Sequence, residues 1–340
     1  MLGEGVVGER IRTAGISVYT LGMRRGRPSI RAVWQLRSIL GQEHPAIMQT
    51  WMYHADLLGT LVGALTRRPP LIWCVHAAKL DVTQYRRLTG WTIRFCVWLS
   101  RLPRVVVVNS EATYRDHLNL GYRPRQWKTI ANGFDLGKFK PDPSARSSLR
   151  KELNLSSETL LIGLIARYDP MKDHSTFLQA AAKLAQVEPN VHFVLAGGGV
   201  TDQNATLAVQ IDRLQLRPRV HLLGLRADMP RINAALDIAS SSSSFGESFS
   251  NSTAEAMACG VPCVVTDVAN LPHLIGDTGL AVPLKDPAAL AKGWRQLMAM
   301  GQQERQRLGQ RARRRIEQHY SLDRMVRGYE ELYLSLGECR

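Results

Sequence analysis

The sequence has no apolar run close to the roughly 20 residues that a membrane-spanning helix needs. Its longest apolar-leaning stretch, residues 57–65, is interrupted by Gly59, Thr60 and Gly63. The first ten residues also lack the apolar core of a secretory signal. Five cysteines, an odd number, stand at spacings that match neither a disulfide framework nor a zinc site. We therefore expect a cytoplasmic protein with reduced thiols and no bound metal.

Acidic residues are scarce in one part of the chain. Residues 1–140 contain 21 basic and 8 acidic side chains, whereas residues 141–340 contain 23 and 21, so most of the net charge of +15 lies in the first part. Such an asymmetry indicates an anionic partner, which is a nucleic acid, a membrane surface or a phosphorylated substrate. The alternative is a basic surface that has no partner.

Aromatic residues make up only 7% of the chain. A nucleic-acid-binding protein is expected to interleave aromatic with basic residues or to carry a recognisable reading motif. Neither feature is present, so we expect no nucleic acid as a partner. Nucleic-acid binding is kept as the main alternative outside enzymology.

Short β-branched runs alternate with helical patterns along most of the 340 residues. Strands are expected at residues 16–21, 46–50, 71–75, 104–109, 127–131, 160–166, 191–196, 219–223, 237–240, 262–266 and 279–282. Helices are expected at residues 30–41, 55–66, 84–101, 111–120, 173–187, 205–215, 229–236 and 252–259, and a wholly helical tail follows from 286 to 336 with an N-cap at Ser321. This alternation predicts α/β domains with parallel sheets.

Turn-forming residues crowd together at 132–144 and divide the chain. We expect an N-terminal Rossmann-like domain over residues 1–140 and a second domain over 141–320. Residues 321–340 are expected to form a helix that packs back toward the first domain. Polar residues directly after each strand are the candidate ligands, because parallel sheets bind substrates at the carboxyl ends of their strands.

The densest polar segment covers residues 243–262. A strand ends near Ser240, and a helix begins near Asn251, so the free N–H groups of residues 248–252 form an anion site. Glu247 and Glu255, on either side of that helix start, suit sugar hydroxyls better than phosphate. The alternative is that Glu255 only complements the helix dipole and Glu247 is solvated.

A second segment delivers Arg167 at the end of a strand and Lys172 just before a helix. Two cations at this place suit a diphosphate, although each could also be an ordinary surface cation. Glycines follow the next two strands at 197–199 and at Gly224, where they allow a ligand to approach the backbone or simply form turns.

Together these residues resemble retaining glycosyltransferase family 4, whose members have the GT-B fold of two facing doubly wound Rossmann-like domains. Glu247 and Glu255 match the E-x7-E motif of the family, within GE-x-F-x-N and EAMACG-x-P. Further matches extend the resemblance over nearly the whole chain. Arg167 and Lys172 match the R-x4-K pair of the family, and Asn132 and Gly133 match its NG turn. Residues 109–111 match its NSE strand end, and residues 51–56 match a segment of members that act on bacterial polysaccharides.

The resemblance implies a transfer of sugar from a nucleotide-sugar donor to a saccharide or lipid-linked acceptor, with retention, in polysaccharide or glycolipid synthesis. Glu247, Arg167, Lys172 and His76 would be catalytic, and His76 could also be an ordinary surface histidine. No metal and no cofactor are implied, because cationic side chains neutralise the diphosphate. The substrate-binding residues implied are Glu255, Ser248, Phe249, Ser250, Asn251, Gly198, Gly224, Leu225, His54 and Asn132.

The sequence departs from the family pattern at Ser250, where proline is usual, and at Asp173, where many members have glycine. Residues 14–23 resemble a segment that follows the first βαβ unit of family members. We therefore expect an incomplete first domain that lacks about 30 or more residues, with little or no activity in this chain. The alternatives that keep the fold are a catalytically silent sugar-nucleotide binder and a nucleotide-sugar epimerase.

Trp91, Phe95 and Trp98 recur at helical spacing among arginines in the basic part of the chain. This combination suits a helix at an anionic membrane surface, so the protein is a candidate for peripheral binding to the inner face of the cytoplasmic membrane. The alternative is that the three rings form the core face of a crossover helix.

Overall fold

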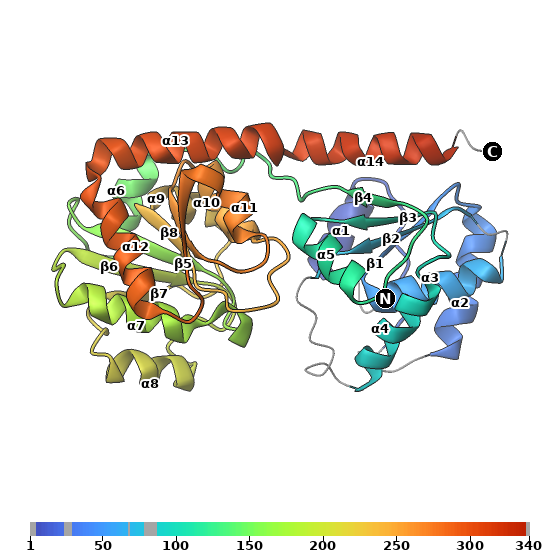
Figure 1. The fold of residues 1–340 in the computed structure, drawn as a ribbon, viewed down its shortest axis with the longest axis horizontal. Coiled ribbons are helices and arrows are strands. Elements are labelled where there is room, and N and C mark those ends of the chain that lie inside the picture. Colours follow the sequence, from blue (N-terminus) through green and yellow to red (C-terminus); the bar gives the residue numbers. More distant parts are fainter. Residues whose placement is uncertain (1–4, 24–28, 67–68, 78–86, 338–340) are drawn as a thin grey trace. The chain divides into compact units, whose positions relative to one another are not determined.

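The computed structural model describes residues 5–23, 29–66, 69–77 and 87–337. The chain divides into two compact units, shown in Figure 1, and each is described by itself. Unit 1 comprises residues 1–76, 80–130 and 329–340, and unit 2 comprises residues 77–79 and 131–328. No helix in the described part of the chain is long and apolar enough to cross a membrane.

Unit 1 contains a parallel four-stranded sheet in the order β1-β2-β3-β4. The strands are β1 (Met48–Trp51), β2 (Leu71–Val75), β3 (Val105–Val108) and β4 (Trp127–Thr129). The helices are α1 (Gly5–Thr13), α2 (Ile30–Glu43), α3 (Tyr53–Ala64), α4 (Arg87–Leu99) and α5 (Glu111–Asn119). Every residue of β2 and β3 is buried, which accounts for their continuous apolar sequences.

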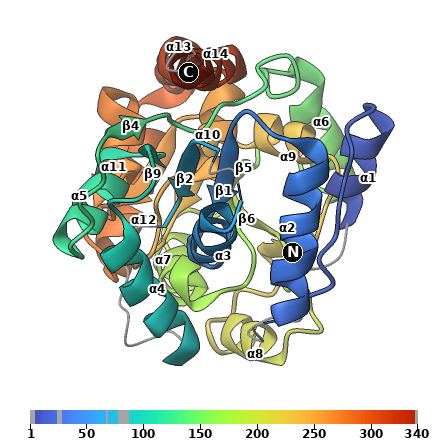
Figure 2. The ribbon, with the colours of Figure 1, turned by 90° about the vertical axis from the view of Figure 1, so that its right-hand side faces the viewer.

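Helix α3 packs on β1 and β2, and Figure 2 shows it between α2 and α4. Its residue Asp56 is fully buried, and its Oδ1 accepts a hydrogen bond of 2.6 Å from the hydroxyl of Thr50 on β1. Its Oδ2 has no hydrogen-bond partner among the described residues. Burial raises the pKa of Asp56 to about 7, because the charged carboxylate is poorly solvated there.

The strand expected at residues 16–21 is wrong, because the structure has irregular chain there. Ile16 and Tyr19 are exposed, and Gln35 of α2 donates a side-chain hydrogen bond to the carbonyl of Thr20. The β-branched residues of this segment favour a strand, but no described strand pairs with it. A helix that we did not expect, α1, precedes it.

Unit 2 contains a parallel six-stranded sheet in the order β10-β9-β8-β5-β6-β7. The strands are β5 (Leu160–Ile165), β6 (Val191–Ala196), β7 (Val220–Leu222), β8 (Ile238–Ser241), β9 (Cys263–Thr266) and β10 (Gly279–Val282). The helices are α6 (Pro143–Glu152), α7 (His174–Ala185), α8 (Ala205–Arg213), α9 (Met229–Ala235), α10 (Asn251–Ala258), α11 (Leu271–Ile275), α12 (Pro287–Ala299) and α13 (Gly301–His319), with 3₁₀ turns at Pro170–Lys172 and Gly276–Thr278. The expected α/β fold with parallel sheets is confirmed.

Alternate residues of the central strand β5 face two separate cores. Leu161 packs with α6, α9, α10 and α13 on one face, whereas Ile162 and Leu164 pack with α7, α8 and α12 on the other. Both faces of the sheet are therefore covered by helices (Figure 1).

The helical tail consists of α12, α13 and α14 (Leu322–Gly337). Ser321 accepts a hydrogen bond from the N–H of Arg324, so the expected N-cap is confirmed. Helix α14 begins in unit 2, and its residues from Tyr329 onward belong to unit 1. There the ring of Tyr329 lies 6.0 Å from that of Trp51, and the hydroxyl of Tyr333 donates to Gln49.

Candidate functional site

The strand order of unit 2 reverses at β5, which pairs with β6 on one side and with β8 on the other. Ligands in open parallel sheets bind at this kind of switch point, beyond the carboxyl ends of the strands. The turn Pro170–Lys172 follows β5, and the loop of residues 242–250 follows β8. The two segments that the sequence analysis selected are therefore neighbours in space.

An ion pair joins these two segments. The Nζ of Lys172 donates to the Oε2 of Glu247, and both side chains are largely buried. The same oxygen accepts a hydrogen bond of 2.9 Å from the hydroxyl of Ser243. A buried carboxylate with a cation and a hydroxyl on one oxygen is held in one orientation.

Backbone contacts fix the same two segments. The hydroxyl of Ser242 donates to the carbonyl of Lys172 over 2.8 Å, and the N–H of Ser244 donates to the carbonyl of Met171 over 2.9 Å. Gly246 has a φ of +69°, and a Cβ there would lie 2.9 Å from the sulfur of Met171. The loop after β8 is thus seated directly on the turn after β5.

Arg167 follows β5 with an exposed side chain, and its Nε donates to Asp169 over 3.1 Å. An exposed pair of this kind contributes little to stability, because water solvates both charges. The guanidinium can therefore turn toward an anionic ligand at small energetic cost.

Glycines allow close backbone approach beside Arg167. A Cβ on Gly197 would lie 2.2 Å from the carbonyl oxygen of Ala166, so no other residue fits there. The N–H of Tyr168 donates to the carbonyl of Gly198, and a Cβ on Gly198 itself would meet nothing within 4 Å. Gly224, at φ +63°, accepts a 2.8 Å hydrogen bond from the N–H of Gly197. Gly198 and Gly224 therefore lie in adjoining turns, and Leu225 follows with an exposed side chain.

The start of α10 is not capped by its N-cap residue. Ser250 directs its hydroxyl to that of Thr253, at 2.9 Å, and makes no side-chain bond to the helix backbone. The amide of Asn132 donates to Asn251 over 2.9 Å, which brings the NG turn to this helix end. Ser248 is half-buried in the loop just before. Free N–H groups at a helix start attract anions.

Phe249 does not present its ring to a ligand. The ring is buried at 5.9 Å from that of Phe134 and at 5.4 Å from that of Tyr320, measured between centroids. Only the backbone of Phe249 remains for substrate contacts, and its side chain anchors the loop to the core.

Glu255 is half-buried in α10, and desolvation raises the pKa of its carboxyl to about 7, with the nearby charge of Lys138 opposing the shift. A carboxyl group with such a pKa changes its charge in the physiological range. Its position four residues after the start of α10 places it beside the anion site.

His76 and His54 lie in unit 1, at the carboxyl ends of neighbouring strands. His76 follows β2, where burial lowers the pKa of its ring to about 4, and its ring stands edge-on to that of Trp51 with 4.9 Å between centroids. His54 is exposed in the first turn of α3, after β1. A neutral histidine donates a hydrogen bond at one ring nitrogen and accepts one at the other.

The sequence analysis missed the pairing of Lys172 with Glu247 and the part played by Ser242 and Ser243. The run of serines at 240–244 was the available signal of a polar site, because serines after a buried strand provide hydroxyl groups on small side chains. Its partners could not be read, since they lie about 70 residues earlier in the chain.

Two family models match the chain. Residues 3–138 match the model described as "Glycosyltransferase Family 4", and residues 159–300 match "Glycosyl transferases group 1". The structure of the Anabaena protein HepE in complex with UDP and glucose superimposes with a TM-score of 0.78 at 26% identity, covering 90% of this chain and 81% of that chain.

Two curated relatives are similar over parts of their length. A UDP-Gal:alpha-D-GlcNAc-diphosphoundecaprenol alpha-1,3-galactosyltransferase of Escherichia coli is 25% identical over 244 residues, which are 70% of this chain and 62% of the relative. A D-inositol 3-phosphate glycosyltransferase of Mycobacterium sp. strain KMS is 30% identical over 205 residues, which are 58% of this chain and 45% of the relative. The match thus spans about half to three fifths of these proteins. With a family 4 domain followed by a group 1 domain on two parallel-sheet units, the chain belongs to the GT-B glycosyltransferases.

Proposed function

We propose that this protein transfers a sugar from a nucleotide-sugar donor to a saccharide or lipid-linked acceptor, with retention, in cell-surface polysaccharide or glycolipid synthesis. The observation that carries the proposal is the buried pair of Lys172 and Glu247 at the switch point of unit 2. HepE, a structural neighbour, binds UDP and glucose, and the Escherichia coli relative acts on a lipid-linked diphosphate, which supports both substrate classes.

In this proposal the donor diphosphate lies at the start of α10. Lys172 and Arg167 stabilise the negative charge that grows on the diphosphate as its bond to the sugar breaks. Glu247 accepts hydrogen bonds from the donor sugar, and the N–H groups of residues 248–251 assist at the phosphate. These cations take the role that a metal ion has in other transferases, so we expect transfer to persist when chelator is added.

The acceptor is proposed to bind unit 1, where His76 and His54 follow adjacent strands. His76 is held neutral at ordinary pH by its low pKa. A neutral imidazole suits a hydrogen bond to an acceptor or donor-sugar hydroxyl better than it suits a phosphate.

Thermal unfolding with UDP, GDP, ADP and dTDP and their sugars tests the donor proposal. A ligand that binds only the native state raises the melting temperature, so at least one of these compounds should raise it by several degrees at a concentration of about 100 Kd. If none of the four nucleotide classes shifts the transition, the donor proposal is wrong.

Glu255 makes donor binding depend on pH. The ionised carboxylate accepts hydrogen bonds from both ribose hydroxyls, whereas the protonated form donates one. With a pKa of about 7, affinity for the nucleoside should rise about fivefold to tenfold between pH 6 and pH 8. The measurement is a titration with the nucleoside of the preferred donor, which has no phosphate to ionise. Glu255→Gln should remove the pH dependence, and an equal dependence in that variant would contradict the assignment.

The exposed aromatic face of α4 supports a membrane contact. Trp91, Phe95 and Trp98 are all at least half exposed, whereas Ile93 and Cys96 provide the buried face of this helix. The interpretation of the three rings as the core face is therefore wrong for unit 1. Arg94 lies over the ring of Trp91 at 5.4 Å, and the charge of this part of the chain is strongly positive. We propose that this face binds the anionic inner surface of the cytoplasmic membrane, as suits a lipid-linked acceptor.

Sedimentation with vesicles tests this proposal. The wild-type protein should co-sediment with vesicles that contain phosphatidylglycerol, and high salt should reduce binding. The double variant Trp91→Ala/Trp98→Ala should lower the bound fraction about tenfold or more, because two interfacial anchors are lost. Trp34→Ala is the matched control, since Trp34 of α2 is also exposed and carries Arg37 over its ring. Equal loss in the control, or no binding of the wild-type protein to phosphatidylglycerol vesicles, would contradict a specific role for α4.

A further inference from the structure

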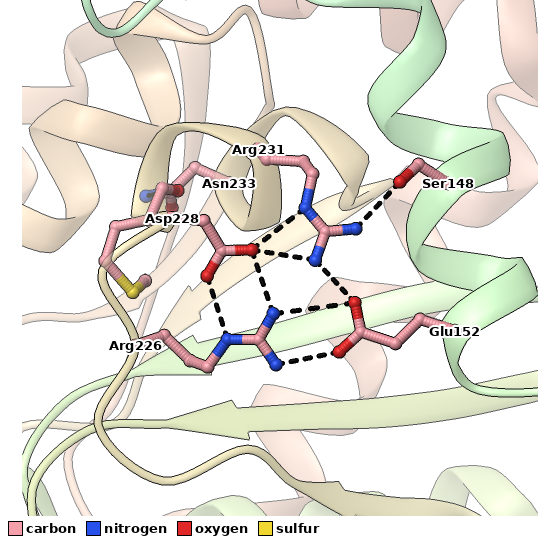
Figure 3. A network of polar contacts seen from close by, with 7 residues as sticks. Ser148, Glu152, Arg226, Asp228, Arg231 and Asn233 are labelled. Atoms are coloured by element: carbon pink, nitrogen blue, oxygen red, sulfur yellow. Dashed lines mark hydrogen bonds and ion pairs between the residues drawn. The ribbon is translucent and has the colours of Figure 1, made fainter.

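Two arginines and two carboxylates form a closed network in unit 2, shown in Figure 3. Arg226 donates to Asp228 over 2.8 and 2.9 Å and to Glu152 over 2.7 Å. Arg231 donates to the same two carboxylates, and it also bonds the hydroxyl of Ser148 over 2.8 Å. The network joins the loop after β7 to the last turn of α6.

Each charge in this network is matched by two opposite charges. The guanidinium groups hold the pKa values of Asp228 and Glu152 well below their usual range, and the carboxylates raise the pKa values of Arg226 and Arg231. The network is therefore neutral as a whole. Arg226 stands near the carboxyl ends of the strands, but its planar fork is already filled by carboxylates. It is consequently a poor candidate for a phosphate ligand.

Helix α6 is a firm anchor for the network. Its residue Arg150 is buried and donates to the carbonyls of Thr159 and Ala235 and to the carboxylate of Asp237. These bonds tie α6 to the beginning of β5 and of β8. Glu152, at the end of the same helix, is thus presented from a fixed position.

The loop that the network holds is the one that carries Leu225. On one side, the N–H of Gly224 donates to the carbonyl of Val200 over 2.9 Å, and the carbonyl of Gly224 accepts from Gly197 in the turn beside Arg167. On the other side stands Arg226 with its carboxylates. Between them Leu225 is 84% exposed, more than any other large apolar side chain in the described ranges. A ring that stacks on such a side chain removes apolar surface of both groups from water, which favours the contact.

We propose that Glu152, Arg226, Asp228 and Arg231 are positioning residues that fix residues 224–226 as the seat of the donor nucleobase, with Leu225 against its face. This inference rests on the proposed function. The guanidinium groups of the network already bond to carboxylates, so in this proposal the network acts on the base alone, through the preorganisation of the loop. It also predicts that the nucleoside and its diphosphate lose affinity by the same factor when the network is broken.

The test compares three probes: the nucleoside diphosphate that most raises the wild-type melting temperature, its nucleoside, and inorganic pyrophosphate. Arg226→Gln and Glu152→Gln should each weaken the nucleoside and the diphosphate about tenfold, and by equal factors, while pyrophosphate affinity changes less than twofold. The double variant should be no weaker than Arg226→Gln alone, because both changes break one network. Arg226→Lys keeps the charge but loses the planar guanidinium, so its affinities for the nucleoside and the diphosphate should lie between those of the wild type and of Arg226→Gln.

Arg217→Gln is the matched control, because Arg217 also bridges two carboxylates, Asp202 and Asp212, in unit 2. It should leave all three affinities within twofold of wild type. Loss of diphosphate affinity without loss of nucleoside affinity would mean that Arg226 binds phosphate and would overturn the proposal. A loss of pyrophosphate affinity as large as the loss of nucleoside affinity would overturn it as well. So would unchanged nucleoside affinity in both Arg226→Gln and Glu152→Gln. Failure of every nucleotide to bind the wild-type protein would instead refute the proposed function.

Discussion

Replacement of Lys172 by alanine is expected to lower turnover by about 10²–10³-fold. The Nζ of Lys172 is a largely buried cation at the proposed donor site, and it also orients Glu247. Its removal takes away charge stabilisation in the transition state and leaves a buried carboxylate without its cation. The measurement is release of the nucleoside diphosphate from the preferred donor, under saturating conditions.

Two companion variants separate the catalytic effect from a loss of fold. Lys183→Ala removes an exposed lysine from the last turn of α7 and should retain full turnover. Lys172→Arg keeps the positive charge and should recover part of the activity. Near-normal turnover in Lys172→Ala, with an unchanged melting temperature, would refute the assignment of the donor site.

Replacement of Asp56 by asparagine is expected to change how stability depends on pH. The folded-state pKa of about 7 lies above the value of about 4 for an unfolded chain. The fold favours the protonated form of Asp56. The contribution of this group to the free energy of unfolding is therefore fully present below pH 4 and is lost as the pH rises through 7. The difference in the free energy of unfolding between wild type and Asp56→Asn should therefore shift by roughly 3–4 kcal/mol, in favour of the variant, between pH 4 and pH 8.

Denaturant unfolding at several pH values measures this difference. The buried histidines, such as His174, whose pKa burial lowers to about 4, titrate alike in both proteins and cancel in the comparison. Asp116→Asn on α5 is the control, because Asp116 lies in the same unit at a half-buried rather than a fully buried position. A difference curve that stays flat between pH 4 and pH 8 would show that Asp56 is not held protonated by the fold.

Much of unit 2 could be predicted from the sequence, because its strands are buried on both faces and appear as continuous apolar runs. The run Leu160–Ile165 is an example, and the polar residues that follow it mark the site. The strand order could not be predicted, because nothing local shows that β8 returns beside β5. The Lys172–Glu247 pair and the Glu152–Arg226 pair depend on that order.

Unit 1 shows where pattern alone was insufficient. The β-branched residues at 16–21 favour a strand, but a strand also needs a neighbour with which to pair, and none is described. Trp91, Phe95 and Trp98 share a helix face, yet periodicity does not reveal whether a face is covered. The buried side chains of α4, such as Cys96, face α3, against which α4 packs. The size and spacing of the three rings favour the aromatic face as the buried one, but the structure buries the face that carries Ile93 and Cys96.

The most direct test is a crystal structure of the protein with the nucleoside diphosphate that it binds best. We expect a diphosphate at the start of α10 within hydrogen-bond distance of the Nζ of Lys172, ribose hydroxyls on the carboxylate of Glu255, and the base against Leu225. Density for the nucleotide at any other place on unit 2, with Lys172 still paired only to Glu247, would contradict this expectation.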